Sequence, residues 1–150
     1  MQTLINGVDY AEIVDRLSSV KADDEARWGM MSAPEMLCHL RGAFRVAMGE
    51  LPSVLVDVPM PRELLKSKAL WEPTPWQKNF YTVPALRLGT PTIRIGLFED
   101  DQAEVLVEME RFRRPEQGRV DRSLFGQMSY VDWMRWGYVH TDHHLTQFGR

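Results

Sequence analysis

The chain has 150 residues, of which 44% are hydrophobic and 26% are charged, and its net charge at pH 7 is −3. A chain of this size and composition can bury a core without disulfides, and we expect one domain over residues 1–150. The slightly acidic balance excludes the strongly basic surface typical of proteins that bind nucleic acids or anionic membranes. The single cysteine, Cys38, excludes an internal disulfide and fits a reducing compartment. Without a signal-peptide pattern or an apolar run of ~20 residues, the chain is expected to be cytoplasmic.

The first predicted helix begins at Asp9, because Glu12 stands at the third helical position, where it can complete a capping box. Apolar residues then recur at helical spacing up to about Ser19. The polar run at 21–27 is either a continuation of this helix or a solvated connection, and the Trp-Gly pair at 28–29 ends it.

The second predicted helix has a stronger start signal. Ser32 is the expected N-cap and Glu35 its capping-box partner, and the helix is expected to end near Gly49. Its apolar face consists of residues at helical spacing, namely Met36, Leu40, Ala43, Phe44 and Ala47. His39 lies beside this face, so its side chain is expected to point toward the core.

The segment from 51 to 96 contains seven of the nine prolines and no long periodic element. A short helix is predicted at 61–69, with Leu64 and Leu65 packing inward. The rest is expected to be an ordered loop, because aromatic side chains are costly to leave in water, and it contains Trp71, Trp76, Phe80 and Tyr81. Loops of this length usually cover something functional, so we expect the segment to form part of a pocket wall.

Two further helices are predicted in the last third of the chain. The first runs from about 97 to 114, with acidic residues at its start, basic residues at its end and Pro115 after it. The second begins after Ser129, with Asp132 as capping-box partner, and its inward face comprises Trp133, Gly137, His140, His144 and Phe148. Four long helices with a long crossover between the second and third predict an all-α fold, a four-helix bundle.

The histidines suggest a metal site. His140 and His144 are four residues apart, so their rings lie on one helical face, and His39 lies on the inward face of the second helix. Together they would supply three neutral nitrogen ligands and leave one coordination position open. A His-x-x-x-His pair is nevertheless a weak motif, and histidines near a helix C-terminus can also simply interact with the helix dipole.

Three residues near the predicted metal site have alternative interpretations. His143 points about a hundred degrees away from His144 and is expected at the rim of the site or in solvent. Gln147 is placed to line the mouth of the site or to bond an imidazole N–H. Glu35 is one turn before His39 and near enough to approach the metal, although its role in the capping box already explains its presence. Cys38 is interpreted as a small buried hydrophobic residue. No general base is convincingly placed, so no catalytic residue is assigned.

Three motifs lie around His39 and at the C-terminus: Arg-Trp-Gly-Met-Met-Ser at 27–32, Met-Leu-Cys-His-Leu at 36–40 and Trp-Gly-Tyr-Val-His-Thr-Asp-His-His-Leu-Thr-Gln-Phe-Gly at 136–149. With these motifs the chain resembles the DinB-like superfamily, and most closely a branch known only as a domain of unknown function. The resemblance extends over most of the chain. The resemblance implies a four-helix bundle that holds nickel or zinc through one histidine of the second helix and two of the last. Those positions here are His39, His140 and His144. Where many relatives have Arg-Gly-Gln after the final ligand, this chain has Leu-Thr-Gln at 145–147.

The superfamily includes thiol-dependent S-transferases and isomerases, and proteins described as metal-dependent hydrolases. The leading hypothesis is therefore an enzyme whose divalent metal, zinc or nickel, activates water or a thiol, as in a hydrolase or a thiol S-transferase. The alternative is a metal-stabilised binding or structural module without catalysis. The expected partner is a small molecule, with a low-molecular-weight thiol as one candidate. A homodimer is a candidate assembly, and neither nucleic acid nor membrane is expected to bind.

Overall fold

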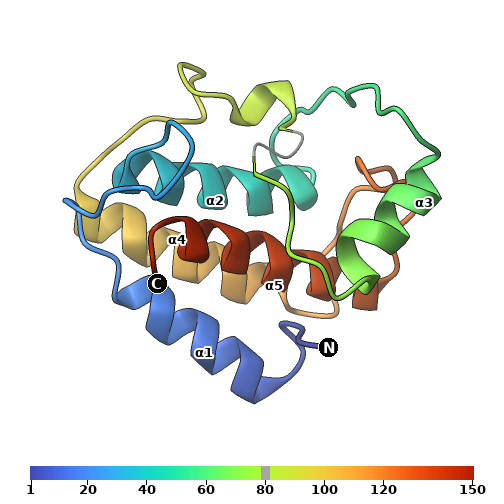
Figure 1. Ribbon diagram of the computed structural model, residues 1–150, viewed down its shortest axis with the longest axis horizontal. Helices are drawn as coiled ribbons and strands as arrows, with labels where there is room; N and C mark the ends of the chain where they lie inside the picture. The colour runs from blue at the N-terminus through green and yellow to red at the C-terminus, as the bar shows by residue number, and fades with distance from the viewer. Residues whose placement is uncertain (79–81) are drawn as a thin grey trace.

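The computed structural model describes residues 1–78 and 82–150, and these residues form helices and loops without a β-strand (Figure 1). The prediction of an all-α chain is confirmed. In chain order the elements are α1 (Gly7–Ser18), α2 (Ala33–Ala47), α3 (Arg62–Lys66), a π-helical turn (Ser67–Trp71), a 3-10 turn (Pro84–Leu86), α4 (Phe98–Phe112) and α5 (Tyr130–Gln147). None of the helices described is long and apolar enough to cross a membrane.

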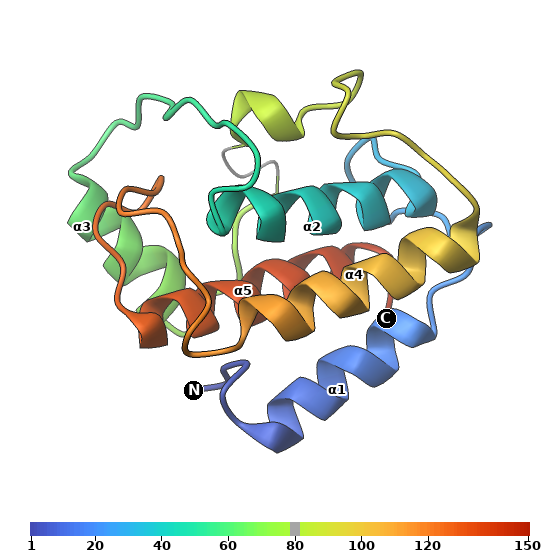
Figure 2. The same ribbon diagram turned by 180° about the vertical axis from the view of Figure 1, so that it is seen from behind.

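The four longer helices lie side by side in two pairs. Helices α1 and α5 run in one direction and α2 and α4 in the other, as the colour gradients along the ribbons show (Figures 1 and 2). Helix α2 packs along α4, and α1 packs against α5. The largest side chains sealed between these helices include Ile13, Leu17, Phe44, Met109, Phe112 and Met134. This packing holds α2 and α5 in fixed positions relative to each other.

Two of the predicted helix starts are confirmed in detail. The Ser32 hydroxyl accepts the N–H of Glu35 at 3.3 Å, and the Glu35 carboxylate accepts the N–H of Ser32 at 2.8 Å. Ser129 and Asp132 form the same reciprocal pair at the start of α5, at 3.1 and 2.9 Å. Each pair satisfies two backbone donors that would otherwise lack partners at the helix end.

The predicted start of the first helix at Asp9 is wrong. Asn6 is the N-cap, and its side-chain oxygen accepts the N–H groups of Val8 and Asp9 at 2.8 and 3.3 Å. The Asp9 carboxylate instead accepts the N–H of Thr3 at 2.9 Å, so it ties the N-terminal segment to the helix. Because α1 ends at Ser18, the polar run after it is a connection and not a helical continuation.

The short helix predicted in the segment between α2 and α4 is present. Of the two leucines predicted to pack inward, however, only one is buried. Leu65 is buried at 4% exposure, whereas Leu64 is 46% exposed, because α3 lies at the edge of the molecule and buries only one side (Figure 1). The Trp71 indole N–H donates to the Asp132 carboxylate at 2.8 Å, which fastens this part of the segment to the start of α5. The predicted packing of Phe80 and Tyr81 lies outside the residues that the structure describes.

Gly137 allows two other parts of the chain to approach α5 closely. A Cβ atom at this position would lie 2.6 Å from the Leu4 side chain and 3.1 Å from the Phe112 ring. Leu4 is fully buried, and its N–H donates to the carbonyl of Met134 at 3.2 Å. The glycine in the middle of α5 therefore has a packing reason, as its helical position predicted.

Candidate metal centre

The structure brings His39, His140 and His144 together in the interior. Their exposed fractions are 4%, 8% and 7%, and one ring nitrogen from each lies within 4.8 Å of the others. His39 comes from α2, and the other two come from successive turns of α5. The Nε2 atoms of His39 and His140 are 3.1 Å apart. Residues about a hundred positions apart in sequence thus meet at one point.

A backbone carbonyl fixes the orientation of His39. Its Nδ1 atom lies 3.3 Å from the carbonyl oxygen of Leu86, which can only accept, so Nδ1 carries the proton. The Nε2 lone pair of the neutral ring then faces the other two histidines. Burial lowers the pKa of His39 from 6.5 to about 4, so the imidazole is neutral at pH 7.

A side-chain amide plays the corresponding part for His144. Its Nδ1 atom donates to the Gln147 side-chain oxygen at 2.9 Å, and the amide nitrogen of Gln147 donates to the carbonyl of Trp28 at 2.6 Å. The second bond fixes which way the amide faces, and hence which nitrogen of His144 is protonated. Gly29 permits this close contact, since a Cβ there would lie 2.4 Å from the Gln147 amide nitrogen.

His140 is oriented by packing. Its ring stacks on Trp136, with centroids 5.1 Å apart and planes at 28°, and faces Trp76 at 5.7 Å and 32°. Its Nδ1 atom is buried and has no hydrogen-bond partner among residues 1–78 and 82–150. Burial, followed by the neighbouring histidines, holds the pKa of His140 well below its ordinary value. The same causes, burial foremost, lower the pKa of His144.

This arrangement fits a divalent metal ion. With Nδ1 protonated on His39 and His144, the Nε2 lone pairs of these rings are free to bind. In tetrahedral coordination with Zn–N bonds of ~2.0–2.1 Å, ligand nitrogens lie about 3.3 Å apart. The 3.1 Å between the Nε2 atoms of His39 and His140 is close to that value. Neutral imidazoles suit zinc and nickel alike.

The two remaining candidates, His143 and Glu35, lie outside the histidine cluster. His143 is half-buried between two indoles, with ring centroids 6.0 Å from Trp28 and 5.8 Å from Trp76, and forms part of a cavity wall. Its ring is therefore beside the histidine cluster and outside it. The Glu35 carboxylate is engaged in its capping box and belongs neither to the cluster nor to the cavity lining.

A cavity of about 440 Å³ opens directly onto the three histidines. Its volume lies within the usual range for small-molecule sites. The walls come from α2 and α5, from residues 28–31 before α2, from residues 120 and 122–125 after α4, and from the segment between α2 and α4. That segment contributes Leu51, Leu55, Trp76, Val83 and Leu86 among others. The prediction that this segment forms part of a pocket wall is confirmed.

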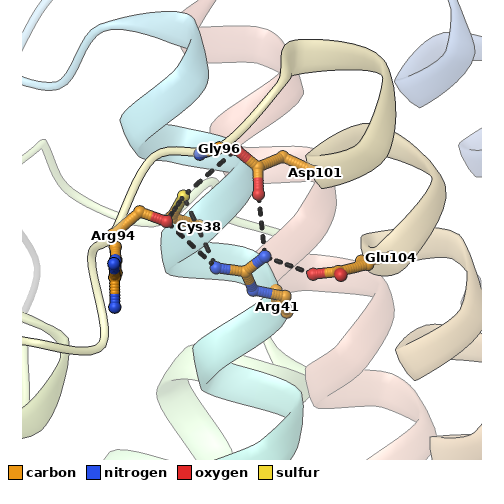
Figure 3. Close-up of polar contacts among 6 residues, drawn as sticks. All are labelled: Cys38, Arg41, Arg94, Gly96, Asp101 and Glu104. Atoms are coloured by element: carbon orange, nitrogen blue, oxygen red, sulfur yellow. Dashed lines mark hydrogen bonds and ion pairs between the residues drawn. The ribbon is translucent and has the colours of Figure 1, made fainter.

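A polar cluster between α2 and α4, apart from the three histidines, was not predicted (Figure 3). Its centre is Asp101 of α4, which is only 3% exposed and accepts bonds from the Arg41 guanidinium and the Gly96 N–H, both at 2.8 Å. The Cys38 thiol is 3.3 Å from the carbonyl of Arg94 and 3.8 Å from the Asp101 carboxylate. Cys38 is therefore more than a buried hydrophobe, and burial, with Asp101 next, raises the pKa of its thiol to about 11. The only feature of the sequence that indicated this cluster is the position of Asp101, an acidic residue in the first turn of a helix.

The polar cluster fastens the end of the segment between α2 and α4 onto α2. Arg41 also donates to the carbonyl of Arg94, and Glu104 binds the same guanidinium from the solvent side (Figure 3). Gly42 directly follows Arg41 in α2, and a Cβ at Gly42 would lie 2.5 Å from the Thr92 side chain and 3.0 Å from that of Leu86. The stretch that presents the Leu86 carbonyl to His39 is thus held against the helix that carries His39.

Comparisons of the chain with family models, with curated proteins and with solved structures found no match. The resemblance to the DinB-like superfamily accordingly depends on the residues quoted for it.

Proposed function

We propose that this protein is a DinB-like metalloprotein, in which α1, α2, α4 and α5 form a four-helix bundle and the segment 48–97 crosses from α2 to α4. We further propose that it binds one zinc or nickel ion through His39, His140 and His144. The observation that carries the proposal is the meeting of three buried ring nitrogens within 4.8 Å. Three neutral imidazoles in an apolar interior need partners, and one divalent ion would satisfy all of them.

The function that this site supports best is metal-assisted catalysis on a small molecule. A bound ion with an open position would lower the pKa of a coordinated water or thiol toward neutrality, which serves a hydrolase or a thiol S-transferase equally. The chain's own contribution is positional. The Leu86 carbonyl and Gln147 fix two of the imidazoles, and the indoles of Trp76 and Trp136 hold the third and exclude water.

A second candidate is a metal-stabilised module without catalysis. Helix α2 packs more extensively on α4 than on α5, so an ion shared by His39, His140 and His144 would add a link where direct packing is sparse. Metal binding of this kind adds directly to the free energy of unfolding. The aromatic cavity beside the histidines favours the enzyme. A catalytic metal site keeps an open coordination position that a substrate must reach, whereas a purely structural site needs no such space.

The metal site is tested by elemental analysis of protein purified without an affinity tag. We expect close to one zinc or nickel ion per chain in the wild type, and loss of the ion in His140→Ala and His144→Ala. His143→Ala is the matched control, since this ring lies beside the cluster, and it should retain the ion. Circular dichroism of each variant separates loss of ligand from loss of fold. Equal metal loss in all three variants would contradict the ligand assignment.

Catalysis is tested separately on protein with stoichiometric metal. The protein is assayed against a panel of esters, amides and thiol-conjugation acceptors, before and after removal of the ion by a chelator. Turnover that disappears with the ion and returns on its replacement supports the enzyme. A chelator-sensitive melting temperature without turnover on any compound supports the structural module.

A further inference from the structure

The charges around the cavity are sparse and of one sign. Among the described residues that line it, Arg122 is the only arginine, lysine, aspartate or glutamate. The remaining walls are mainly apolar and include four tryptophans, Trp28, Trp76, Trp133 and Trp136. No lining carboxylate is therefore present, in the part of the chain described, to balance a positive charge inside the cavity.

The proposed metal ion would bring such a charge. Three neutral imidazoles leave the full double positive charge of a divalent ion in place. Apolar walls lower the local dielectric and strengthen the attraction between the ion and any anion that enters. The open coordination position should consequently prefer an anionic group over a neutral one.

Arg122 supplies a second positive charge, which is available to a ligand. Its side chain is exposed, and its guanidinium makes no hydrogen bond or ion pair with residues 1–78 or 82–150. Arg41, by contrast, is committed to Asp101 and Glu104. A guanidinium presents its N–H groups as a planar fork that matches a carboxylate in two parallel bonds.

We propose, on the basis of the proposed metal site, that the cavity binds an apolar molecule with an anionic group at each end. One anionic group occupies the open metal position, the apolar body lies among the tryptophans, and a carboxylate at the other end binds Arg122. Opposite charges then meet at both ends: one anionic group faces the ion and the other faces the guanidinium, while the uncharged part of the ligand faces uncharged walls. A volume of about 440 Å³ accommodates such a molecule.

Two hydroxamates test this assignment on zinc-loaded protein. Both carry the same metal-binding hydroxamate and the same alkyl chain, but one ends in a carboxylate and the other in a carboxamide. Calorimetry should show the carboxylate binding roughly tenfold more tightly, the ratio expected for one charge-assisted pair. In Arg122→Gln the ratio should fall to about one, while binding of the carboxamide is unchanged.

Arg114→Gln is the matched control, because it removes the same charge from an exposed arginine outside the cavity. It should retain the tenfold ratio. A ratio that persists in Arg122→Gln, or is lost equally in both variants, overturns the assignment of Arg122. If zinc binds stoichiometrically but neither hydroxamate does, the ligand assignment fails and the metal site stands. If zinc does not bind, the proposed function fails and this inference fails with it.

Discussion

The Nδ1 atom of His39 lies 3.3 Å from the carbonyl oxygen of Leu86, and this contact joins α2 to the segment that precedes α4. A histidine that binds metal through one nitrogen commonly gives its other N–H to such an acceptor, which fixes the ring and its tautomer. The N–H of Leu86 donates to the carbonyl of Val83 at 3.0 Å, within the 3-10 turn that carries the Leu86 carbonyl. The cluster around Asp101 fastens residues 94 and 96 of the same segment to α2, and we expect it to help position that carbonyl.

Asp101→Asn should therefore weaken metal binding although Asp101 is no ligand. The variant loses the charge that holds Arg41, so the segment carrying the Leu86 carbonyl becomes less constrained. We expect zinc affinity to fall roughly 10- to 100-fold, the usual effect of changing an outer partner of a ligand. Competition with a chelating dye measures the affinity, and nitrogen NMR of the metal-free protein reports the His39 tautomer.

Glu104→Gln is the control for Asp101→Asn. Glu104 binds the same Arg41 guanidinium, but its side chain is 58% exposed, and Figure 3 marks no polar contact from it to Arg94 or Gly96 of the segment before α4. Its replacement should leave both the zinc affinity and the tautomer unchanged. An Asp101→Asn variant that stays folded and binds zinc as the wild type does would show that the polar cluster has no part in positioning His39.

Gln147→Ala tests the second imidazole contact. It removes the acceptor for the His144 Nδ1–H and also the bond from the Gln147 amide to the Trp28 carbonyl. We expect zinc affinity to fall roughly 10- to 100-fold. Thr146→Ala, one residue away and exposed, should bind zinc as the wild type does. Similar affinities for the two variants would mean that Gln147 does not orient His144.

Gly137→Ala should destabilise the fold, although alanine is the better helix former by ~1 kcal/mol. The added methyl group would lie 2.6 Å from Leu4 and 3.1 Å from Phe112, and overpacking of this kind costs about 1–3 kcal/mol. The expected result is a net loss of about 1 kcal/mol in the free energy of unfolding, measured by urea denaturation. Gly7→Ala in α1 is the control, because nothing lies within 4 Å of its Cβ position, and it should stabilise or be neutral.

The parts of this fold that could be read from sequence are those set by local chemistry. The capping boxes at Ser32 and Ser129 involve residues three apart, and the four-residue spacing of His140 and His144 is a property of any helix. The start of the first helix was missed for a local reason too. Asn6 caps this helix, whereas the carboxylate of Asp9, the predicted cap, accepts the N–H of Thr3.

The parts that could not be read depend on residues distant in sequence. The bond between Arg41 and Asp101 spans 60 positions, and the contact of His39 with Leu86 spans 47. Neither pair has a spacing that a helix or a turn would fix, so no local sequence pattern predicts either contact. Whether Leu64 or Leu65 is buried depends likewise on which side of α3 meets the rest of the molecule.

The metal-free protein should lose stability in mild acid. Burial lowers the pKa of His39 to about 4 and those of His140 and His144 well below 6.5. In the unfolded chain these groups take up protons near pH ~6.5. Stability should thus be fully present above pH ~6.5 and fall as the pH drops toward 4, because only the unfolded state binds protons in that range. Urea denaturation at pH 7.5, 6 and 5 measures the loss, and a stability that stays constant across this range would contradict it.

Metal binding should be less sensitive to acid than at an ordinary surface histidine site. A ligand must be neutral to bind, so unperturbed histidines release metal as the pH falls below ~6.5. Here burial already keeps His39 neutral in the folded, metal-free protein down to a pKa of about 4. Zinc affinity of the folded state, measured against a chelator calibrated at each pH, should change little between pH 7.5 and 5.5 and fall steeply only near pH 4. A decline that begins at pH 6.5 would mean that protons enter the cluster freely, and that the interior does not hold these rings neutral.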